Sequence, residues 1–128
     1  MRLLLDTHAL LWWVLQDQRL SKPAFAALSD ANSTLVVSAV SASEIATKFR
    51  SGKLAVPPTL AEQLAQLVAI RGWQRLALSL EHAQLAGRLP GVHRDPFDRM
   101  LAAQALIDDI PIVTNDAAIA AFGAKVMW

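Results

Sequence analysis

Residues 94–106 read RDPFDRMLAAQAL, and they place two acidic side chains at the start of an apolar helix. Pro96 has no N–H to lose and a φ angle already close to the helical value, which suits the first helical position. Asp95 is then expected to be the N-cap and Asp98 the third residue of the first turn. The residues that follow are apolar on most faces, as in a helix buried against a sheet. The stretch therefore predicts a helix from Pro96 to Ile107 whose acidic end is anchored to the core.

Aspartate is favoured at helix starts in any protein, because its carboxylate accepts from free N–H groups and faces the positive end of the helix dipole. Taken alone, Asp95 and Asp98 therefore indicate a cap rather than a catalytic site. A catalytic interpretation requires further acidic residues to converge on the same place.

The composition predicts one ordered domain over residues 1–128. Hydrophobic residues make up 54% of the chain and charged residues 18%, which excludes intrinsic disorder. No apolar run reaches the ~20 residues of a transmembrane helix, and Asp6 comes too soon for a signal peptide, so no membrane association and a cytoplasmic location are expected. The net charge of +1 gives no overall attraction to nucleic acid. A polyanionic substrate would need a local basic patch or a metal ion.

Short apolar runs alternate along the chain with segments of helical periodicity. The expected strands are 2–5, 35–37, 75–80, 110–113 and 125–127. The expected helices are 8–15, 21–29, 41–50, 57–70, 81–89, 96–107 and 117–122. The third of these helices begins with Ser41 and Glu44 at the spacing of a capping box. The alternation predicts an α/β fold with a mostly parallel sheet of four to five strands and helices on both faces.

Acidic residues follow the expected strands, at the edge where an α/β sheet binds its ligands. Asp6 ends the first strand, Glu44 comes shortly after the second, and Asp116 follows the fourth. Asp98, with Asp95 beside it, opens the helix that leads into the fourth strand. Carboxylates gathered at one edge would repel one another and raise each other's pKa values, and a divalent cation would remove that cost.

The available ligands favour Mg²⁺ or Mn²⁺ over zinc. The chain has no cysteine, and His8, His82 and His93 are scattered along it, so the expected site is made of oxygen ligands. Such a site suits phosphodiester hydrolysis, because the cation offsets the phosphate charge and lowers the pKa of a bound water. The sequence favours neither one ion nor two.

Four segments, taken together, resemble a PIN domain. They are Leu3-Leu4-Leu5-Asp6-Thr7, Ser38 with Ser41-Ala42-Ser43-Glu44, the run from Asp95 to Ala105, and Thr114-Asn115-Asp116. Their order is similar to that of the VapC-type toxin ribonucleases of bacterial toxin–antitoxin pairs, over the whole chain.

This resemblance implies a three-layer α/β/α domain with the activity of a metal-dependent endoribonuclease. The residues that match the family's four acids are Asp6, Glu44, Asp98 and Asp116, with Asp95 as an extra acid close by. The resemblance also implies products with 5′-phosphate and 3′-hydroxyl ends, a homodimer, and a small antitoxin protein whose tail blocks the site.

Other polar residues receive supporting interpretations. Four lie at strand ends, where they could orient carboxylates or water, and local turn capping explains them equally well: Thr7, Ser38, Thr114 and Asn115. Five basic residues are candidates for contact with RNA phosphates: Lys48, Arg50, Lys53, Arg94 and Arg99. The tryptophans are expected in packing or in a protein interface: Trp12, Trp13, Trp73 and Trp128.

Two other enzyme classes place an aspartate after the first strand, and neither fits. A haloacid-dehalogenase-like phosphotransferase needs a second aspartate two residues later, where this chain has His8. A receiver domain needs a phosphate-accepting aspartate after the third strand, where residues 79–83 read SLEHA. The alternative that stays open is a PIN-like module that binds protein or RNA with little catalysis.

Overall fold

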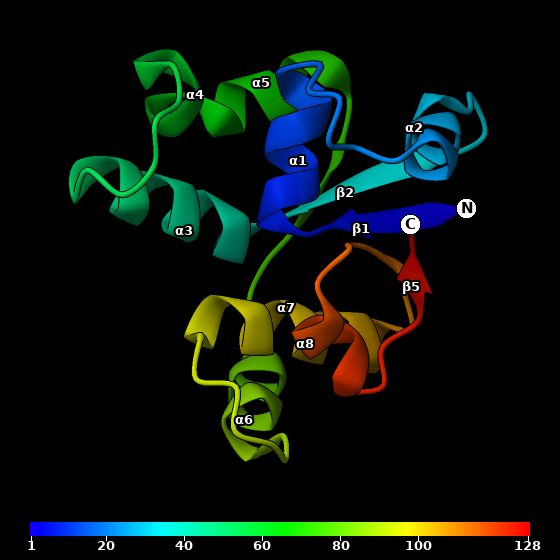
Figure 1. The fold of residues 1–128 in the computed structure, drawn as a ribbon, viewed down its shortest axis with the longest axis vertical. Helices are drawn as coiled ribbons and strands as arrows, with labels where there is room; N and C mark the ends of the chain where they lie inside the picture. Colours follow the sequence, from blue (N-terminus) through cyan, green and yellow to red (C-terminus); the bar gives the residue numbers. More distant parts are fainter.

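A five-stranded, fully parallel sheet forms the centre of the computed structural model, which describes residues 1–128 (Figure 1). Its strands are β1 (Arg2–Leu5), β2 (Thr34–Ser38), β3 (Gln74–Leu76), β4 (Ile112–Val113) and β5 (Val126–Met127), in the order β3-β2-β1-β4-β5. The central strand β1 pairs with β2 on one side and β4 on the other. The predicted parallel sheet of four to five strands is confirmed.

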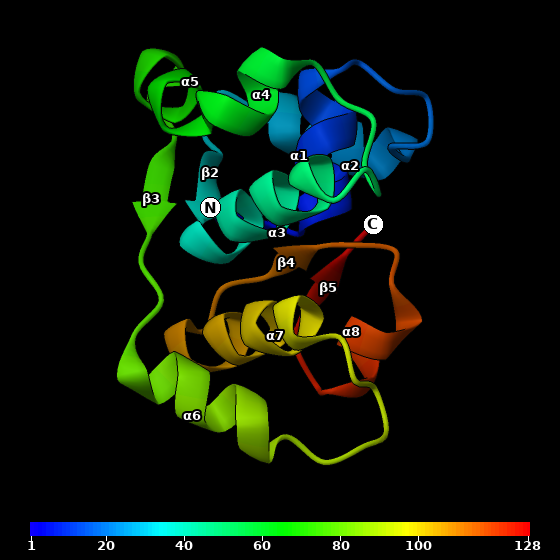
Figure 2. The same ribbon diagram turned by 90° about the vertical axis from the view of Figure 1, so that its left-hand side faces the viewer.

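Eight helices surround the sheet. They are α1 (Thr7–Val14), α2 (Lys22–Ser29), α3 (Ala39–Arg50), α4 (Pro58–Glu62), α5 (Leu64–Arg71), α6 (Leu80–Arg88), α7 (Pro96–Asp108) and α8 (Ala117–Ala121). Helices α1, α2, α4 and α5 lie on one side of the sheet, and α6, α7 and α8 lie on the other (Figures 1 and 2). These seven helices cover its two faces, while α3 follows β2 and contacts α1, α4 and α7. No helix is long and apolar enough to span a bilayer.

The period-two geometry of β1 divides the core into two clusters. Leu3 and Leu5 point to the cluster that α1, α2, α4 and α5 complete, whereas Leu4 points to the cluster under α6, α7 and α8. All three leucines are fully buried. This explains why the strand reads as a continuous apolar run rather than an alternating one.

One predicted helix start was wrong. The helix expected to begin at Ser41 is α3, which begins at Ala39, because the hydroxyl of Ser38 accepts from the amide of Val40 at 2.9 Å. Ser41 is buried inside the helix, and Glu44 lies in the second turn instead of the first.

Two further elements differ from expectation. The helix expected over residues 57–70 is interrupted at Gln63, whose φ of −126° and ψ of 28° are not helical, and this divides it into α4 and α5. The strand expected over residues 75–80 shortens to β3, because the hydroxyl of Ser79 caps α6 and takes the chain out of the sheet. The boundaries of the other elements agree with expectation to within two residues.

Candidate active site at the carboxyl edge of the sheet

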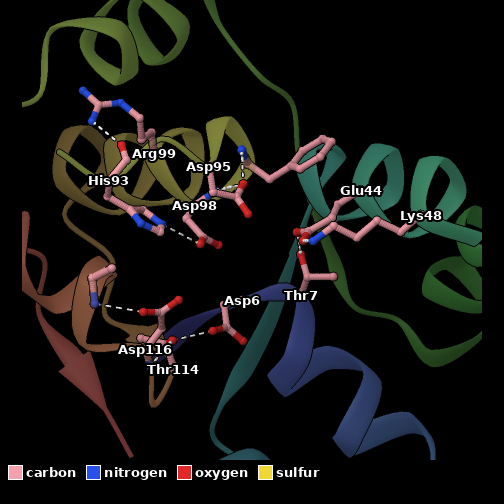
Figure 3. Close-up of polar contacts among 12 residues, drawn as sticks. Asp6, Thr7, Glu44, Lys48, His93, Asp95, Asp98, Arg99, Thr114 and Asp116 are labelled. Carbon is pink, nitrogen blue, oxygen red and sulfur yellow. Dashed lines mark hydrogen bonds and ion pairs between the residues drawn. The ribbon is translucent and has the colours of Figure 1, made fainter. Parts of the chain in front are cut away.

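Acidic residues from four helix starts or turns converge at the carboxyl edge of the sheet. Asp6 follows β1 and caps α1, and Asp116 follows β4 and caps α8. Asp98 lies in the first turn of α7, and Glu44 comes from α3. Figure 3 shows the carboxyl groups of Asp98 and Asp116 facing each other across one space, with Asp6, whose carboxylate is turned toward Thr114, and Glu44 at its sides. The four acids thus come from separate segments of the chain to the same edge of the sheet.

Asp6 is the most constrained of these acids, and only 4% of its surface is exposed. One carboxylate oxygen accepts from the amide of Ala9 at 2.7 Å, and the other accepts from the hydroxyl of Thr114. Burial raises the pKa of Asp6 to about 6, against the opposing effect of these two hydrogen bonds. The carboxylate is thus held in one orientation at a cost in desolvation.

Thr114 links two of the acids across the ends of neighbouring strands. Its hydroxyl donates to Asp6, and its oxygen accepts from the amide of Asp116 at 3.0 Å. A carboxylate oxygen of Asp116 in turn accepts from the amide of Ala118 at 2.8 Å, which caps α8. The structure therefore gives Thr114 the orienting contact expected of it.

Glu44 is 2% exposed, and both of its carboxylate oxygens have partners. The hydroxyl of Thr7 donates to one oxygen at 2.6 Å, and the ammonium of Lys48 forms an ion pair with the other. Burial disfavours the charged form of Lys48, but the hydrogen bond and attraction to Glu44, with the charges of Asp95 and Asp98, raise its pKa overall. Lys48, expected to contact RNA, is thus paired inside the acidic cluster.

Asp95 acts as the helix cap that the sequence predicts. One of its carboxylate oxygens accepts from the amides of Phe97 at 2.9 Å and Asp98 at 3.3 Å. The side chain of Asp98 is thereby left free of capping. Its carboxylate faces the shared space, as Figure 3 shows.

Asp98 contacts a residue that the sequence does not single out. Nε2 of His93 lies 2.8 Å from a carboxylate oxygen of Asp98. Burial raises the pKa of Asp98, the hydrogen bond with His93 opposes this, and the charges of Asp95, Asp116 and Glu44 add to it. His93, Asp98 and Asp116 each offer a ligand atom, and these atoms all lie within 4.8 Å of one another. His93 is distant in sequence from His8, and the fold places it beside two of these acids.

The side chains of two of the supporting residues form no hydrogen bond with the acids. The hydroxyl of Ser38 donates to Oε1 of the buried Gln104 at 2.6 Å, so Ser38 joins β2 to α7 in addition to capping α3. Asn115 is exposed at the end of β4. Ser38 is therefore structural in this fold, in agreement with the capping interpretation.

The basic residues proposed to contact RNA divide into two groups. Arg50, Lys53 and Arg94 are exposed and free to meet a phosphate. Arg99 is not, because its guanidinium donates to the carbonyls of Ala86 at 2.8 Å, His93 at 2.9 Å and Leu89. It also lies over the ring of Phe122, 5.2 Å from the centroid. The structure gives Arg99 a structural role in place of RNA contact.

Substitution of Arg99 by lysine is expected to destabilise the protein by about 2 kcal/mol or more, because one ammonium cannot reach the carbonyls that the planar guanidinium bridges. The positive charge is retained, so a purely electrostatic role would leave stability unchanged. Urea unfolding measures the difference, with Arg94→Lys as the exposed control. Equal stability of the two variants would contradict the structural role.

The tryptophans pack, as expected. Trp12 meets Trp128 edge to face with ring centroids 5.8 Å apart, and Trp13 meets Phe25 at 5.5 Å. Trp73 packs against the core cluster on the same side of the sheet. These ring contacts do not involve the acidic residues of the site.

Comparisons with known proteins agree with this architecture. Residues 3–125 match the model of the PIN domain family. The chain is 34% identical over 116 residues to Ribonuclease VapC22 of Mycobacterium tuberculosis, covering 88% of this chain and 85% of the relative.

Solved structures share the fold at low sequence identity. VapBC-1 from nontypeable Haemophilus influenzae matches with a TM-score of 0.69 and 15% identity, over 98% of this chain and 96% of that one. A toxin–antitoxin complex from Klebsiella pneumoniae matches with a TM-score of 0.60 and 17% identity, over 89% and 86% of the two chains. At these identities the likeness concerns the fold alone.

Proposed function

Because the chain belongs to the PIN domain family, we propose that it is a metal-dependent endoribonuclease and the toxin of a toxin–antitoxin pair. The observation that carries the chemistry is the gathering of Asp6, Glu44, Asp98 and Asp116 at one edge of the sheet, with ligand atoms of Asp98 and Asp116 within 4.8 Å of each other. The relative of known activity is a ribonuclease, which supports RNA as the substrate.

The donor set fits Mg²⁺ or Mn²⁺. The pKa values of Asp6 and Asp98 are both raised, mainly by burial and in smaller part by neighbouring carboxylates, so their charged forms carry an electrostatic cost. A divalent cation held by Asp6, Asp98 and Asp116 would offset this cost. When bound, such a cation offsets negative charge on the phosphate and lowers the pKa of water.

Residues of the chain orient the carboxylates and provide acceptors for the proton that the attacking water loses. Thr114 and the amide of Ala9 fix the carboxylate of Asp6, and Thr7 fixes that of Glu44. Hydrolysis forms a bond from water oxygen to phosphorus and breaks the bond to the 3′-oxygen, which leaves 5′-phosphate and 3′-hydroxyl ends. The carboxylates at this edge are the available acceptors for the proton that the water loses. Arg50, Lys53 and Arg94 are exposed, which supports the proposal that they contact the RNA backbone.

The proposed partners are a cognate antitoxin and a second copy of the chain. The ion pair between Lys48 and Glu44 supports blockage of the site by a protein, because it demonstrates that the acidic cluster accepts an ammonium group. A basic side chain of an antitoxin could enter the cluster on the same principle.

Incubation of the purified protein with a labelled RNA and with DNA of the same sequence tests the proposed activity. We expect only the RNA to be cut, in the presence of Mg²⁺ or Mn²⁺, and the products to carry 5′-phosphate and 3′-hydroxyl ends. A 2′,3′-cyclic phosphate on the products would contradict attack by water. A matched preparation of Asp98→Asn controls for contaminating nucleases.

A further inference from the structure

His93 brings a nitrogen that can ligate a metal into the acidic cluster. It lies in the connection between α6 and α7, and its Nε2 is 2.8 Å from the carboxylate of Asp98. Ligand atoms of His93, Asp98 and Asp116 all lie within 4.8 Å of one another. Lys48 also enters the cluster, but an ammonium has no lone pair while it is charged.

The fold fixes the position of His93. The guanidinium of Arg99 donates to the carbonyl of His93 and to the carbonyls of Ala86 and Leu89. These hydrogen bonds tie the segment between α6 and α7 to the end of α6. The same guanidinium lies over the ring of Phe122, and the imidazole of His93 lies 6.2 Å from that ring. A planar, always charged side chain therefore holds the histidine backbone against α7. Figure 3 shows this arrangement, with the imidazole directed toward Asp98.

The imidazole remains accessible to a small ligand. The side chain of His93 is 32% exposed and that of Asp98 is 18% exposed. In the metal-free protein Nε2 of His93 donates to Asp98. On binding a cation, the ring proton could stand on Nδ1, and Nε2 would then offer its lone pair to the ion. His93 is therefore accessible to an ion and has a ring nitrogen that can serve as its ligand.

The distances require a small adjustment. Two ligands on opposite sides of one ion, each at about 2.1 Å, lie about 4.2 Å apart. The ligand atoms of His93, Asp98 and Asp116 lie within 4.8 Å of one another, and this bound exceeds that separation by a few tenths of an ångström. A cation held by all three residues would have to draw these atoms together by that amount.

We propose that the imidazole of His93 is a nitrogen ligand of the divalent cation, beside Asp98 and Asp116, and that the site therefore prefers first-row transition ions over Mg²⁺. This inference rests on the proposed function, because it concerns the same cation. Mg²⁺ is a hard ion that takes oxygen ligands, whereas imidazole binds transition ions with affinities that rise from Mn²⁺ through Co²⁺. One nitrogen ligand thus increases the difference in affinity between Mg²⁺ and transition ions beyond that of an all-oxygen site.

A different explanation of the contact makes a different prediction. If His93 only holds Asp98 by a hydrogen bond, its loss should weaken all divalent ions to the same extent. Glutamine is the informative replacement, since its amide N–H can still donate to Asp98 and its side chain offers no imidazole nitrogen. His93→Gln therefore separates ligation from positioning.

Titration calorimetry of the full chain with Co²⁺ and with Mg²⁺ tests the proposal, with His8→Gln as the control for loss of an exposed histidine. We expect His93→Gln to weaken Co²⁺ binding by at least about tenfold. We expect its Mg²⁺ affinity to change by less than about threefold, because that ion gains little from imidazole. The visible absorption of bound Co²⁺, which reports the ligand atoms, should change in His93→Gln and not in His8→Gln.

Equal weakening of both ions in His93→Gln, or no weakening of either, would overturn the ligand assignment and leave the proposed function standing. Failure of the unmodified protein to bind any divalent ion would overturn the proposed function as well. Thermal unfolding of each variant without metal confirms that the comparison is made on folded protein.

Discussion

Replacement of Asp98 by asparagine is expected to reduce RNA cleavage by more than about 100-fold, because loss of even an outer-shell partner of a metal ligand costs 10–100-fold. The same change should leave the metal-free protein as stable as before or more stable. Asp95, not Asp98, accepts from the free amides of α7, so asparagine at position 98 does not uncap the helix. It also removes a charge that Asp95, Asp116 and Glu44 repel.

Single-turnover cleavage and thermal unfolding in chelator measure the two effects of Asp98→Asn. Glu81→Gln is the matched control, since Glu81 is an exposed acid in the first turn of α6. The control should keep full activity and lose up to about 1 kcal/mol through its weaker interaction with the helix dipole. Activity of Asp98→Asn within a few-fold of the unmodified protein would exclude this residue from the chemistry.

Without metal, the protein is expected to lose stability as the pH rises from about 4 to about 6. The pKa of Asp6 is raised from 3.8 to about 6 in the folded state, so in this window the folded protein binds more protons than the unfolded chain. The free energy of unfolding therefore falls with rising pH, by up to about 3 kcal/mol from this residue. Asp98, whose pKa is also raised, contributes with the same sign.

Urea unfolding of metal-stripped protein between pH 4 and pH 7 checks this prediction. Asp6→Asn should flatten the decline, because the amide does not titrate and its oxygen can still cap α1. Asp109→Asn, which changes a carboxylate whose side chain is 78% exposed, should leave the slope unchanged. Addition of Mn²⁺ at pH 7 should raise the stability of the unmodified protein and raise that of Asp6→Asn less. An unchanged slope in Asp6→Asn would mean that burial of this carboxylate has no electrostatic cost.

The sheet and three of its acids could be predicted from local patterns. Asp6 and Asp116 end apolar runs, and parallel strands bring their carboxyl ends to one edge. Asp98 follows a proline that fixes the start of its helix. These patterns depend only on residues close together in the chain, so they can be recognised in a single sequence.

The parts that were missed depend on contacts between distant segments. Ser38 and Ser41 are both plausible caps for α3, and the choice is made by Gln104, which binds the hydroxyl of Ser38 from 66 residues away. The contacts of His93 and Arg99 depend on the path of the loop between α6 and α7, and a loop has no hydrophobic periodicity from which its path could be predicted. The pair of Glu44 and Lys48 is different, because spacing of four residues on one helix already favours it.

The most direct test of the acidic cluster as a metal-dependent ribonuclease site is reversible loss of activity on metal removal. A defined RNA would be incubated with the purified protein in excess chelator, and Mn²⁺ would then be added beyond the chelator's capacity. We expect no cleavage in chelator and full recovery on addition of Mn²⁺, with Asp98→Asn inactive throughout. Undiminished cleavage in chelator, shown to come from this protein by its loss in Asp98→Asn, would contradict the metal-dependent mechanism.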